Sequence, residues 1–365
     1  MFDRNLWHYI DWLLVGAILT LCLLGVAMIY SVTGAVHGNP SQLYVKQIYA
    51  IVLGIFALVV CLSIDYRTLA DKSHFIYIGA LALLLYVLVF GTLAGGSRRW
   101  IGLHVFNFQP SEFTKLVVAL VLAKFFGDNR QQVPTVVELG VAGALTLVPL
   151  ALIAKEPDLG TAVTLIPIYL AIAYLAGMRM KMLGILALAF VLLAPVAWRY
   201  GLKDYQKERI VTFLNPSQDA RGAGYQQIQA RITVGSGGLA GKGFGKGMQG
   251  QLQFLPVATN DFIFSVLAEE QGFIGVLLAL GLYLFVIVRA LEAARLSNDR
   301  LGAYLVLGVL ASFTFQVIYN ITMSAGLAPV KGLTLPLMSS GGSSVIATLA
   351  GFGLVLNVRM RRFTN

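Results

Sequence analysis

Ten apolar runs, most of them close to twenty residues long, limit what this chain can fold into more than any other feature. A helix needs about 20 apolar residues to cross the roughly 30 Å hydrocarbon core of a bilayer. The runs lack the alternation of barrel strands, and a helix satisfies its own backbone groups in lipid. We therefore predict an all-α integral membrane protein with about ten transmembrane helices, at 11–32, 45–63, 75–93, 113–126, 136–154, 161–176, 182–200, 262–289, 301–323 and 345–358.

Composition supports a membrane protein and argues against several other classes. Charged residues make up 12% of the chain, against roughly 25% in soluble domains. Both cysteines, Cys22 and Cys61, fall inside apolar runs, so neither a disulfide framework nor a zinc site is expected. The net charge of +10 would suggest nucleic acid for a soluble protein. Here it is better explained by cytoplasmic anchoring and an anionic lipid head group, and we expect no nucleic-acid partner.

The distribution of Lys and Arg predicts the orientation. With both termini cytoplasmic, thirteen of these residues fall on inner loops and tails and six on the short outer loops and outer helix ends. This excess follows the positive-inside rule. The remaining eight, from Arg199 to Lys246, fall on the long loop, whose length puts it near the limit of the rule. The whole chain, 1–365, then forms one polytopic domain, and the long polar segment 201–261 becomes an extracytoplasmic loop between helices seven and eight. No cleavage site follows the first run, which is expected to remain as a helix.

The second outer loop carries an unusual concentration of polar residues. Arg98, Arg99 and Trp100 precede a helix that is expected to have Pro110 in its first turn. On that helix Ser111, Glu112 and Lys115 share one face. An N-cap with a snorkelling lysine would explain this pattern, and so would a polar site. The position of Lys115 about one turn inside the span favours a site, because charges inside a membrane are costly without a partner or a polar cavity.

The third outer turn, Lys155-Glu156-Pro157-Asp158, is charged between two apolar runs. Proline and acidic residues at this place are typical of a helix N-terminus, which is the simpler explanation. The functional alternative is an ionic cluster that faces the same outer cavity as Arg98, Arg99 and Lys115.

The long loop contains a glycine-rich segment and ends at Asp261. The match to GxGxxG in this segment carries no weight, because no strand precedes it. Lys242 and free backbone N–H groups could bind an anionic oxygen cluster, and a flexible linker is equally compatible. Asp261 is predicted either to cap the eighth helix or to act as a base. Glu269 and Glu270 point elsewhere on a straight helix, so the three acids cannot all serve one site.

Two further features lie near the C-terminus. Ser312, Gln316 and Asn320 form a polar stripe on the ninth helix. We favour hydrogen bonds between helices as its role, over the lining of a cavity. The last outer loop, residues 326–344, contains two prolines and several glycines. Irregular backbone at a membrane edge is tolerated where protein or water covers it, so this loop is expected to cap a cavity.

Five motifs occur in order along the chain: Arg99-Trp100-Ile101, Gln109-Pro110-Ser111-Glu112, Lys155-Glu156-Pro157-Asp158-Leu159-Gly160, Asp261-Phe262-Ile263-Phe264 and Gly341-Gly342-Ser343-Ser344. Together they resemble the SEDS (shape, elongation, division, sporulation) family of peptidoglycan polymerases, over essentially the whole chain. The short tails are more similar to the RodA-like elongation branch than to the FtsW-like division branch. The chain departs from the pattern at Ser340, where the family often has tyrosine, and at Lys331, where a small residue is common.

The resemblance implies a peptidoglycan glycosyltransferase that polymerises lipid II on the outer face of the bacterial cytoplasmic (inner) membrane during cell elongation. It implies Asp261 as general base for the acceptor hydroxyl and basic groups that neutralise the leaving undecaprenyl diphosphate. The expected substrate-binding residues are Arg98, Arg99, Trp100, Ser111, Glu112, Lys115, Lys155, Glu156, Asp158, Lys242 and Ser343. No metal-ligand pattern and no tightly bound cofactor are expected; a divalent cation, Mg²⁺ or Mn²⁺, would arrive with the diphosphate.

The resemblance also implies a partner, a class B penicillin-binding protein (a PBP2-like transpeptidase) within the elongation machinery. The long loop and helices eight and nine, with Leu278, Leu282 and Leu305, are expected to meet it. Three alternatives remain: a division-specific polymerase, a lipid II flippase or other transporter, and a scaffold without activity. A transporter should show charged groups on both sides and internal repeats, whereas the polar motifs cluster on the outer side.

Overall fold

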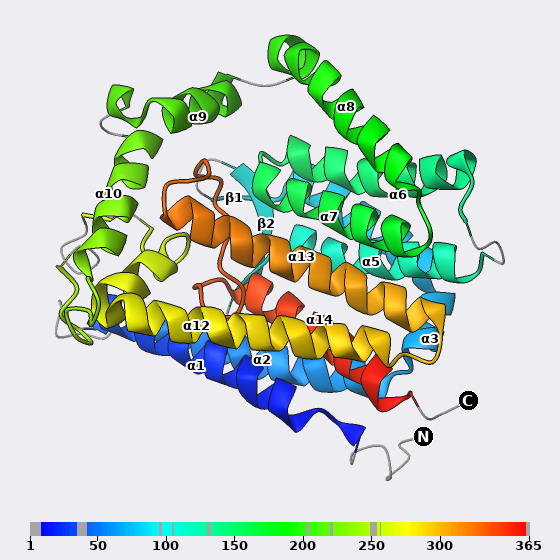
Figure 1. The fold of residues 1–365 in the computed structure, drawn as a ribbon, viewed down its shortest axis with the longest axis horizontal. Helices are drawn as coiled ribbons and strands as arrows, with labels where there is room; N and C mark the ends of the chain where they lie inside the picture. Colours follow the sequence, from blue (N-terminus) through cyan, green and yellow to red (C-terminus); the bar gives the residue numbers. More distant parts are fainter. Residues whose placement is uncertain are drawn as a thin grey trace.

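The computed structural model describes residues 9–34, 42–94, 97–103, 106–129, 133–201, 204–219, 222–248, 254–255 and 257–362. The long helices, shown in Figure 1, are α1 (Trp12–Gly34), α2 (Gln42–Ser63), α4 (Ser73–Phe90), α5 (Pro110–Gly127), α6 (Val136–Lys155), α7 (Leu159–Leu175), α8 (Met180–Val196), α12 (Ile263–Arg295), α13 (Arg300–Ser324) and α14 (Gly342–Met360). The shorter elements are α3 (Tyr66–Asp71), α9 (Asp204–Leu214), α10 (Ala223–Ser236), a π-helical turn (Ala197–Gly201) and a 3₁₀ turn (Pro216–Gln218).

Each predicted apolar run corresponds to one of these long helices. Among the described residues, seven helices have the length and composition to cross a membrane, namely α1, α2, α4, α6, α12, α13 and α14. The helices α7 and α8 are apolar but shorter, at 17 residues each. The protein is therefore a multi-pass, predominantly helical membrane protein.

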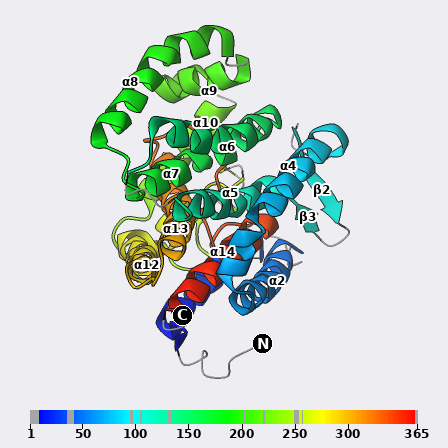
Figure 2. The same cartoon turned by 90° about the vertical axis from the view of Figure 1, so that its right-hand side faces the viewer.

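The connection between α4 and α5 is a small antiparallel sheet, which corrects the all-α prediction in this region. Its strands are β1 (Thr92–Ala94), β2 (Ser97–Leu103) and β3 (Phe106–Phe108), in the order β1-β2-β3. Thr92 pairs with Trp100, and Ile101 pairs with Phe108. These aromatic and β-branched residues favour strands. The sheet lies beside α4 (Figure 2) and carries Arg99 on β2.

The centre of the molecule is formed by α5, α13 and α14. Helix α13 packs against α5, α7, α12 and α14, while α14 lies along α2 and is buried over nearly its whole length. By contrast, α8 stands away from the other long helices, and the chain returns through α9 and α10 (Figure 1). The seventh helix was predicted to end at residue 200; α8 ends at Val196, and α9 is a separate helix.

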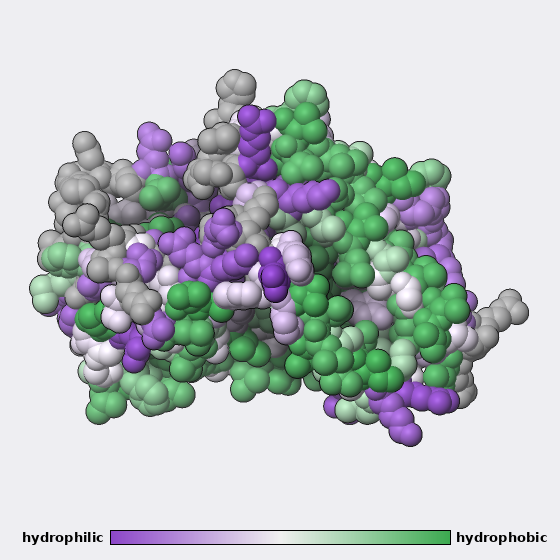
Figure 3. Space-filling view, turned by 90° about the horizontal axis from the view of Figure 1, so that it is seen from above, coloured by the Kyte–Doolittle hydropathy of each residue, from purple (hydrophilic) through white to green (hydrophobic). Residues whose placement is uncertain are grey.

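The two ends of the molecule differ in what they carry. Helix α1 begins and α14 ends at one end of the molecule, which we call the terminal end. Helix α10 and the loop between α13 and α14 lie toward the opposite end, which we call the loop end (Figure 1). Seen from above, hydrophilic side chains gather over the loop end, and apolar side chains cover most of the surface between it and the terminal end (Figure 3). A broad apolar surface between two polar ends is what a bilayer requires.

Helix α12 is broken near the loop end, where the glycine-rich segment packs on it. Gly272 has φ 64° and ψ −164°, and a Cβ there would lie 2.2 Å from the backbone nitrogen of Gly241. The segment fills the break, because the N–H of Lys242 donates to the carbonyl of Glu269 and the N–H of Phe273 donates to the carbonyl of Gly238. The part of α12 from Phe273 to Arg295 is long enough alone to span about 30 Å.

Candidate functional site

Asp261 lies in the turn that precedes α12. The helix begins at Ile263 and its N-cap is Phe262, so the capping role considered for Asp261 is wrong. The Asp261 N–H donates to the carbonyl of Val257 at 3.1 Å. Val257 has φ 55°, which is a genuine outlier for a β-branched residue. Backbone strain of this kind concentrates at functional sites, where the surrounding structure holds it in place.

The loop between α13 and α14 lies directly against Asp261. The Asn320 amide on α13 donates to the carbonyls of Asp261 and Leu333, at 2.8 and 2.7 Å. The loop approaches the carboxylate at Gly332, which has φ 68° and whose Cβ, if present, would lie 3.7 Å from Asp261 Oδ2. Asn320 therefore joins the turn of Asp261 to the loop that covers it.

Burial raises the pKa of Asp261 to about 6, and the positive charges of Arg99 and Arg209 oppose this rise. Arg99 comes from β2 and Arg209 from α9. A third cation, Lys331, precedes Gly332 and lies over the ring of Tyr319, with Nζ 6.0 Å from the ring centroid. Burial, together with the charge of Arg209, lowers the pKa of Lys331. Asp261 thus sits in a basic, partly desolvated environment, which suits both a base and the binding of an anion.

The turn between α6 and α7 places two carboxyl groups in different environments. Asp158 caps α7 and accepts hydrogen bonds from the Thr161 N–H at 3.1 Å and from Gln109 Nε2 at 2.8 Å. Glu156 is the C-cap that follows α6, is 1% exposed, and neither of its oxygens has a hydrogen-bond partner among the described residues. Burial, with the charge of Asp158, raises the pKa of Glu156 to about 8, whereas Arg99 lowers it.

Polar side chains that are far apart in the sequence meet at the start of α5. Gln109 donates to Ser111 Oγ at 3.1 Å as well as to Asp158, and its backbone N–H donates to Ser343 Oγ at 2.9 Å. Ser343, at the start of α14, donates to the carbonyl of Asn107 at 2.8 Å. Three predicted residues that are far apart in the sequence, Ser111, Asp158 and Ser343, are thus brought together.

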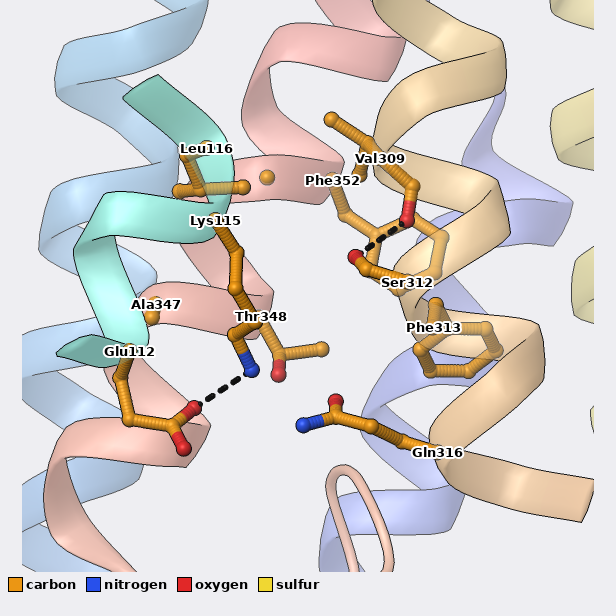
Figure 4. A pocket seen from close by; sticks show the side chains of 11 residues that line it. Glu112, Lys115, Leu116, Val309, Ser312, Phe313, Gln316, Ala347, Thr348 and Phe352 are labelled. Atoms are coloured by element: carbon orange, nitrogen blue, oxygen red, sulfur yellow. Dashed lines mark hydrogen bonds and ion pairs between the residues drawn. The ribbon is translucent and has the colours of Figure 1, made fainter. Parts of the chain in front are cut away.

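Glu112 and Lys115 form a buried ion pair of 2.7 Å on α5, and they line a small cavity between α5, α13 and α14. Figure 4 shows Gln316 of α13 reaching into this cavity toward the pair, with Ser312 higher on the same helix. The snorkelling interpretation of Lys115 is wrong, because the residue is 4% exposed. The preference for bonds between helices is also wrong for Ser312 and Gln316. Ser312 donates within its own helix, and Gln316 Nε2 has no partner in the described residues.

Three predicted residues lie apart from these clusters. Arg98 is exposed and donates to the carbonyl of Val89 at 3.3 Å, and Lys155 is also exposed. Lys242 forms an ion pair of 2.7 Å with Glu269, within the contact between the glycine-rich segment and α12. Glu270 accepts from the N–H of Gly245 in the same segment, so both glutamates contact that segment. Trp100 stays close to the site, because the guanidinium of Arg99 lies over its ring.

Four residues near Asp261 were not among the predicted binding residues: Arg209, Asn320, Lys331 and Gly332. Arg209 ends a charged run, Lys203-Asp204-Tyr205-Gln206-Lys207-Glu208-Arg209, within the long loop, and that run was given no functional role in the sequence analysis. Lys331 was identified as a departure from the family pattern. A lysine where a small residue is common could have indicated a role in the site of this chain. Within the described part of the chain, no group of three or more His, Cys, Asp or Glu is placed to hold a metal ion.

Comparison with known proteins places these features in a family. The family model FTSW_RODA_SPOVE, cell cycle protein, matches residues 11–363. Peptidoglycan glycosyltransferase MrdB of Escherichia coli K12 is 36% identical over 345 residues, covering 94% of this chain and 93% of that protein. The solved Rod shape determining protein RodA of Thermus thermophilus matches with a TM-score of 0.73 and 30% identity, over 98% of each chain.

A second solved structure matches with a TM-score of 0.82 and 32% identity. It is a chain from a peptidoglycan synthase complex that coordinates polymerization and crosslinking. The match covers 98% of this chain and 99% of that one. The family model covers nearly the whole chain, and the E. coli relative is 36% identical to it. These findings confirm the resemblance drawn from the five motifs, and this chain belongs to the FtsW/RodA/SpoVE family of cell cycle proteins.

Proposed function

We propose that this protein is a peptidoglycan glycosyltransferase that polymerises lipid II into glycan strands. Family membership and the activity in the name of the E. coli relative support this function. The observation that carries it is Asp261, a carboxylate with a pKa of about 6 held among Arg99, Arg209 and Lys331. A base and an anion-binding surface in one place are what glycosyl transfer from a diphosphate donor requires.

In the proposed reaction the 4-hydroxyl oxygen of the acceptor sugar attacks the anomeric carbon of the donor. The bond between that carbon and the diphosphate oxygen breaks with inversion, and the electron pair leaves with the undecaprenyl diphosphate. Asp261 takes the hydroxyl proton as the new bond forms. Arg99, Arg209 and Lys331 stabilise the negative charge on the departing diphosphate. A divalent cation would arrive bound to that diphosphate.

We further propose ten membrane spans, with the terminal end in the cytoplasm and the loop end outside. The counts of Lys and Arg support this orientation, and the broad apolar surface between two polar ends agrees with it. Asp261, the last outer loop and the glycine-rich segment then face the outside of the cytoplasmic membrane, where the sugar head group of lipid II would be within reach.

The proposed cellular role is elongation of the wall in rod-shaped growth, with a class B penicillin-binding protein as partner. The similarity to the Rod shape determining protein and to a chain of a synthase complex supports both parts. The family model also includes FtsW, so a division-specific polymerase is the alternative role. Restoration of rod shape, rather than of septation, in cells depleted of either polymerase would distinguish the two roles.

The partner surface predicted on α12 and α13 needs one correction. Leu278 is 71% exposed and can contact a partner helix, whereas Leu305 is fully buried in the core. Leu284 of α12 and Ile318 of α13 are exposed, and we include them in the proposed partner surface in place of Leu305. Loss of co-purification after Leu278→Trp and Ile318→Trp, with polymerase activity retained, would support this surface. Undiminished co-purification of both variants would argue for another surface.

A lipid II flippase remains the second candidate, because the buried pair of Glu112 and Lys115 lines a cavity between helices. The purified protein, free of other polymerases, decides between the two functions. We expect it to convert labelled lipid II in detergent into glycan strands that a muramidase digests. Transfer of lipid II across liposomes without strand synthesis would instead identify a flippase, and neither activity would indicate a scaffold.

A further inference from the structure

The carboxyl group of Glu156 has no part in the reaction described above, although it is among the most deeply buried groups of the site. It is 1% exposed, and both oxygens lack a hydrogen-bond partner among the described residues. Buried polar atoms in folded proteins nearly always have such a partner. Two buried oxygens without one, next to Arg99 and Asp158, indicate that the partner comes with a ligand.

The helix ends around this turn treat its two carboxyl groups differently. Glu156 lies at the C-terminus of α6, whose partial negative charge disfavours an ionised carboxylate, and Asp158 lies at the N-terminus of α7, which favours one. Asp158 also accepts hydrogen bonds from Thr161, Gln109 and Ser111. The turn is therefore built for one charged and one neutral carboxyl group.

Two charged groups act on Glu156: the Asp158 carboxylate in the same turn and the Arg99 guanidinium on β2. Burial and Asp158 together outweigh Arg99, so the pKa of Glu156 rises to about 8 and the acid form predominates at neutral pH. Within the described residues Arg99 has no ion pair, and its Nε has no hydrogen-bond partner. An ionised Glu156 would instead attract Arg99 and repel an anionic substrate.

Building on the proposed polymerase function, we propose that Glu156 works as a neutral carboxylic acid whose O–H donates a hydrogen bond to a diphosphate oxygen of the lipid-linked donor. The acid form leaves the charge of Arg99 available for the same anion and adds a second donor beside it. Hydrogen bonds to an ionised acceptor are about twice as strong as those between neutral groups. Loss of the proton at alkaline pH removes the donor and adds a negative charge, so it sets an upper pH limit for binding.

Two substitutions separate a neutral donor from a charged group. Glu156→Gln keeps the size, the neutral state and an N–H donor, whereas Glu156→Leu keeps only the approximate size. Glu138→Gln, at the exposed start of the same helix, is the matched control, because glutamine also completes a capping box there. The measurements are the affinity for undecaprenyl diphosphate and the rate of strand synthesis from lipid II, on purified full-length protein between about pH 6 and pH 9.5.

We expect the affinity of the wild type to fall as the pH rises through about 8. Glu156→Gln should stay within about threefold of the wild type at neutral pH and lose this alkaline fall, while Glu156→Leu should bind about tenfold more weakly at neutral pH. Glu138→Gln should behave as the wild type. Equal losses in Glu156→Gln and Glu156→Leu, with both variants folded, would overturn the donor role, as would an alkaline fall that persists unchanged in Glu156→Gln.

Infrared difference spectra of wild type minus Glu156→Gln test the protonation state without any assay of activity. We expect the carbonyl band of a protonated carboxylic acid at about pH 7 and its loss above about pH 9, on either side of the pKa. Absence of the band at pH 7 would overturn the proposal whether or not the protein is a polymerase. If the band and the binding pattern are both present but no strands form, the binding role of Glu156 stands and the proposed polymerase function fails.

Discussion

Several buried charged side chains are paired at the terminal end of this molecule, whereas around Asp261 some buried charged groups lack a partner among the described residues. At the terminal end Asp11, whose side chain is 1% exposed, accepts hydrogen bonds from Arg289 at 2.8 and 3.0 Å and also pairs with Arg359. At the loop end Glu156 and Arg99 have buried polar atoms without a partner among the described residues. Buried pairs of the first kind hold helices together, while unpaired groups of the second kind are available to a ligand.

The backbone shows the same contrast. At the terminal end Asn357 Nδ2 donates to the carbonyls of Cys61, Leu62 and Ile64, which closes the C-terminal end of α2. At the loop end Val257 and Leu337 have positive φ angles, 55° and 69°. Strained backbone persists only where the neighbouring structure holds it. The comparison indicates that stability is concentrated at the terminal end and chemistry at the loop end.

Replacing the proposed base should have the largest effect on activity. Asp261→Asn keeps the size of the side chain and the backbone hydrogen bonds to Val257 and Asn320. An amide cannot accept the hydroxyl proton, so we expect strand synthesis to fall about 10²–10⁴-fold. The rate is measured on purified protein, with the melting temperature as control. Activity within a few-fold of the wild type would exclude Asp261 as the base and direct attention to Glu112 and Asp158.

The second-largest effect on activity is expected from removal of Arg99, whose charge acts on both Asp261 and Glu156. Arg99→Ala removes a cation from a poorly hydrated site, and hydrogen bonds to charged groups contribute about 1.5–3 kcal/mol. We expect the rate at limiting lipid II to fall about 10–100-fold. Lys46→Ala, an exposed lysine at the start of α2, is the control and should change the rate little. Equal, small effects of both substitutions would mean that Arg99 does not contact the substrate.

Lowering the pH should titrate the base itself. Since a base must be ionised and the pKa of Asp261 is about 6, kcat is expected to drop about tenfold at pH 5. The folded state favours the protonated form of this group. Its contribution to stability is therefore present at low pH and is lost as the pH rises through about 6. A profile of kcat against pH beside melting curves should show the rate falling on acidification without destabilisation from this group; a flat rate down to pH 5 would contradict the assignment.

The hydrogen bonds of Asn320 allow a smaller effect to be predicted. Asn320→Ala frees the carbonyls of Asp261 and Leu333, so the turn and the last loop lose their shared donor. We expect kcat to fall about tenfold with KM nearly unchanged, because the basic groups stay in place. Thr322→Ala is the control, because the Thr322 hydroxyl donates to the carbonyls of Ile318 and Tyr319 within α13. Lower stability with an unchanged kcat would show that Asn320 supports the fold alone.

The smallest effect on activity is expected at the terminal end, where the effect on stability is large. Asp11→Ala leaves Arg289 and Arg359 without their shared partner, and breaking a buried pair costs about 3–5 kcal/mol. Asp71→Ala, which breaks an exposed pair with Lys124, should cost about 0–1 kcal/mol. Unfolding in denaturant and activity per folded molecule are the measurements. A loss of specific activity in Asp11→Ala would show that the terminal end also contributes to activity.

Asp11 also gives this end its own pH dependence. Burial alone would raise the pKa of Asp11, but the hydrogen bonds from Arg289 and Leu14 and the charges of Arg359 and Arg289 lower it overall. The stability that Asp11 contributes is therefore present at neutral pH and is lost as the pH falls below the usual range of an aspartate. Asp11→Ala should lose this acid sensitivity.

The helices could be predicted from the sequence because each apolar run carries its own signal for length and burial. Contacts between distant segments could not be predicted in the same way. The bonds from Asn320 to Asp261 and Leu333 depend on how α13 turns against two loops, which periodicity does not determine. The burial of Leu305 could not be predicted either, because leucine is equally common in a membrane helix where it faces lipid and where it faces protein. The sheet at Arg99 was missed because its strands are short and lie between much stronger helical signals.

The break in α12 at Gly272 has a consequence for how the protein is made. A helix interrupted near the membrane leaves carbonyl and N–H groups that lipid cannot satisfy, and here residues 238–243 supply the partners. These residues are synthesised before α12, and in the proposed orientation they must already have crossed the membrane when that helix arrives. If the loop lies outside, as proposed, the turns of α12 that precede Gly272 mature only after that loop has been exported, and its translocation becomes a step in the biogenesis of the site that contains Asp261.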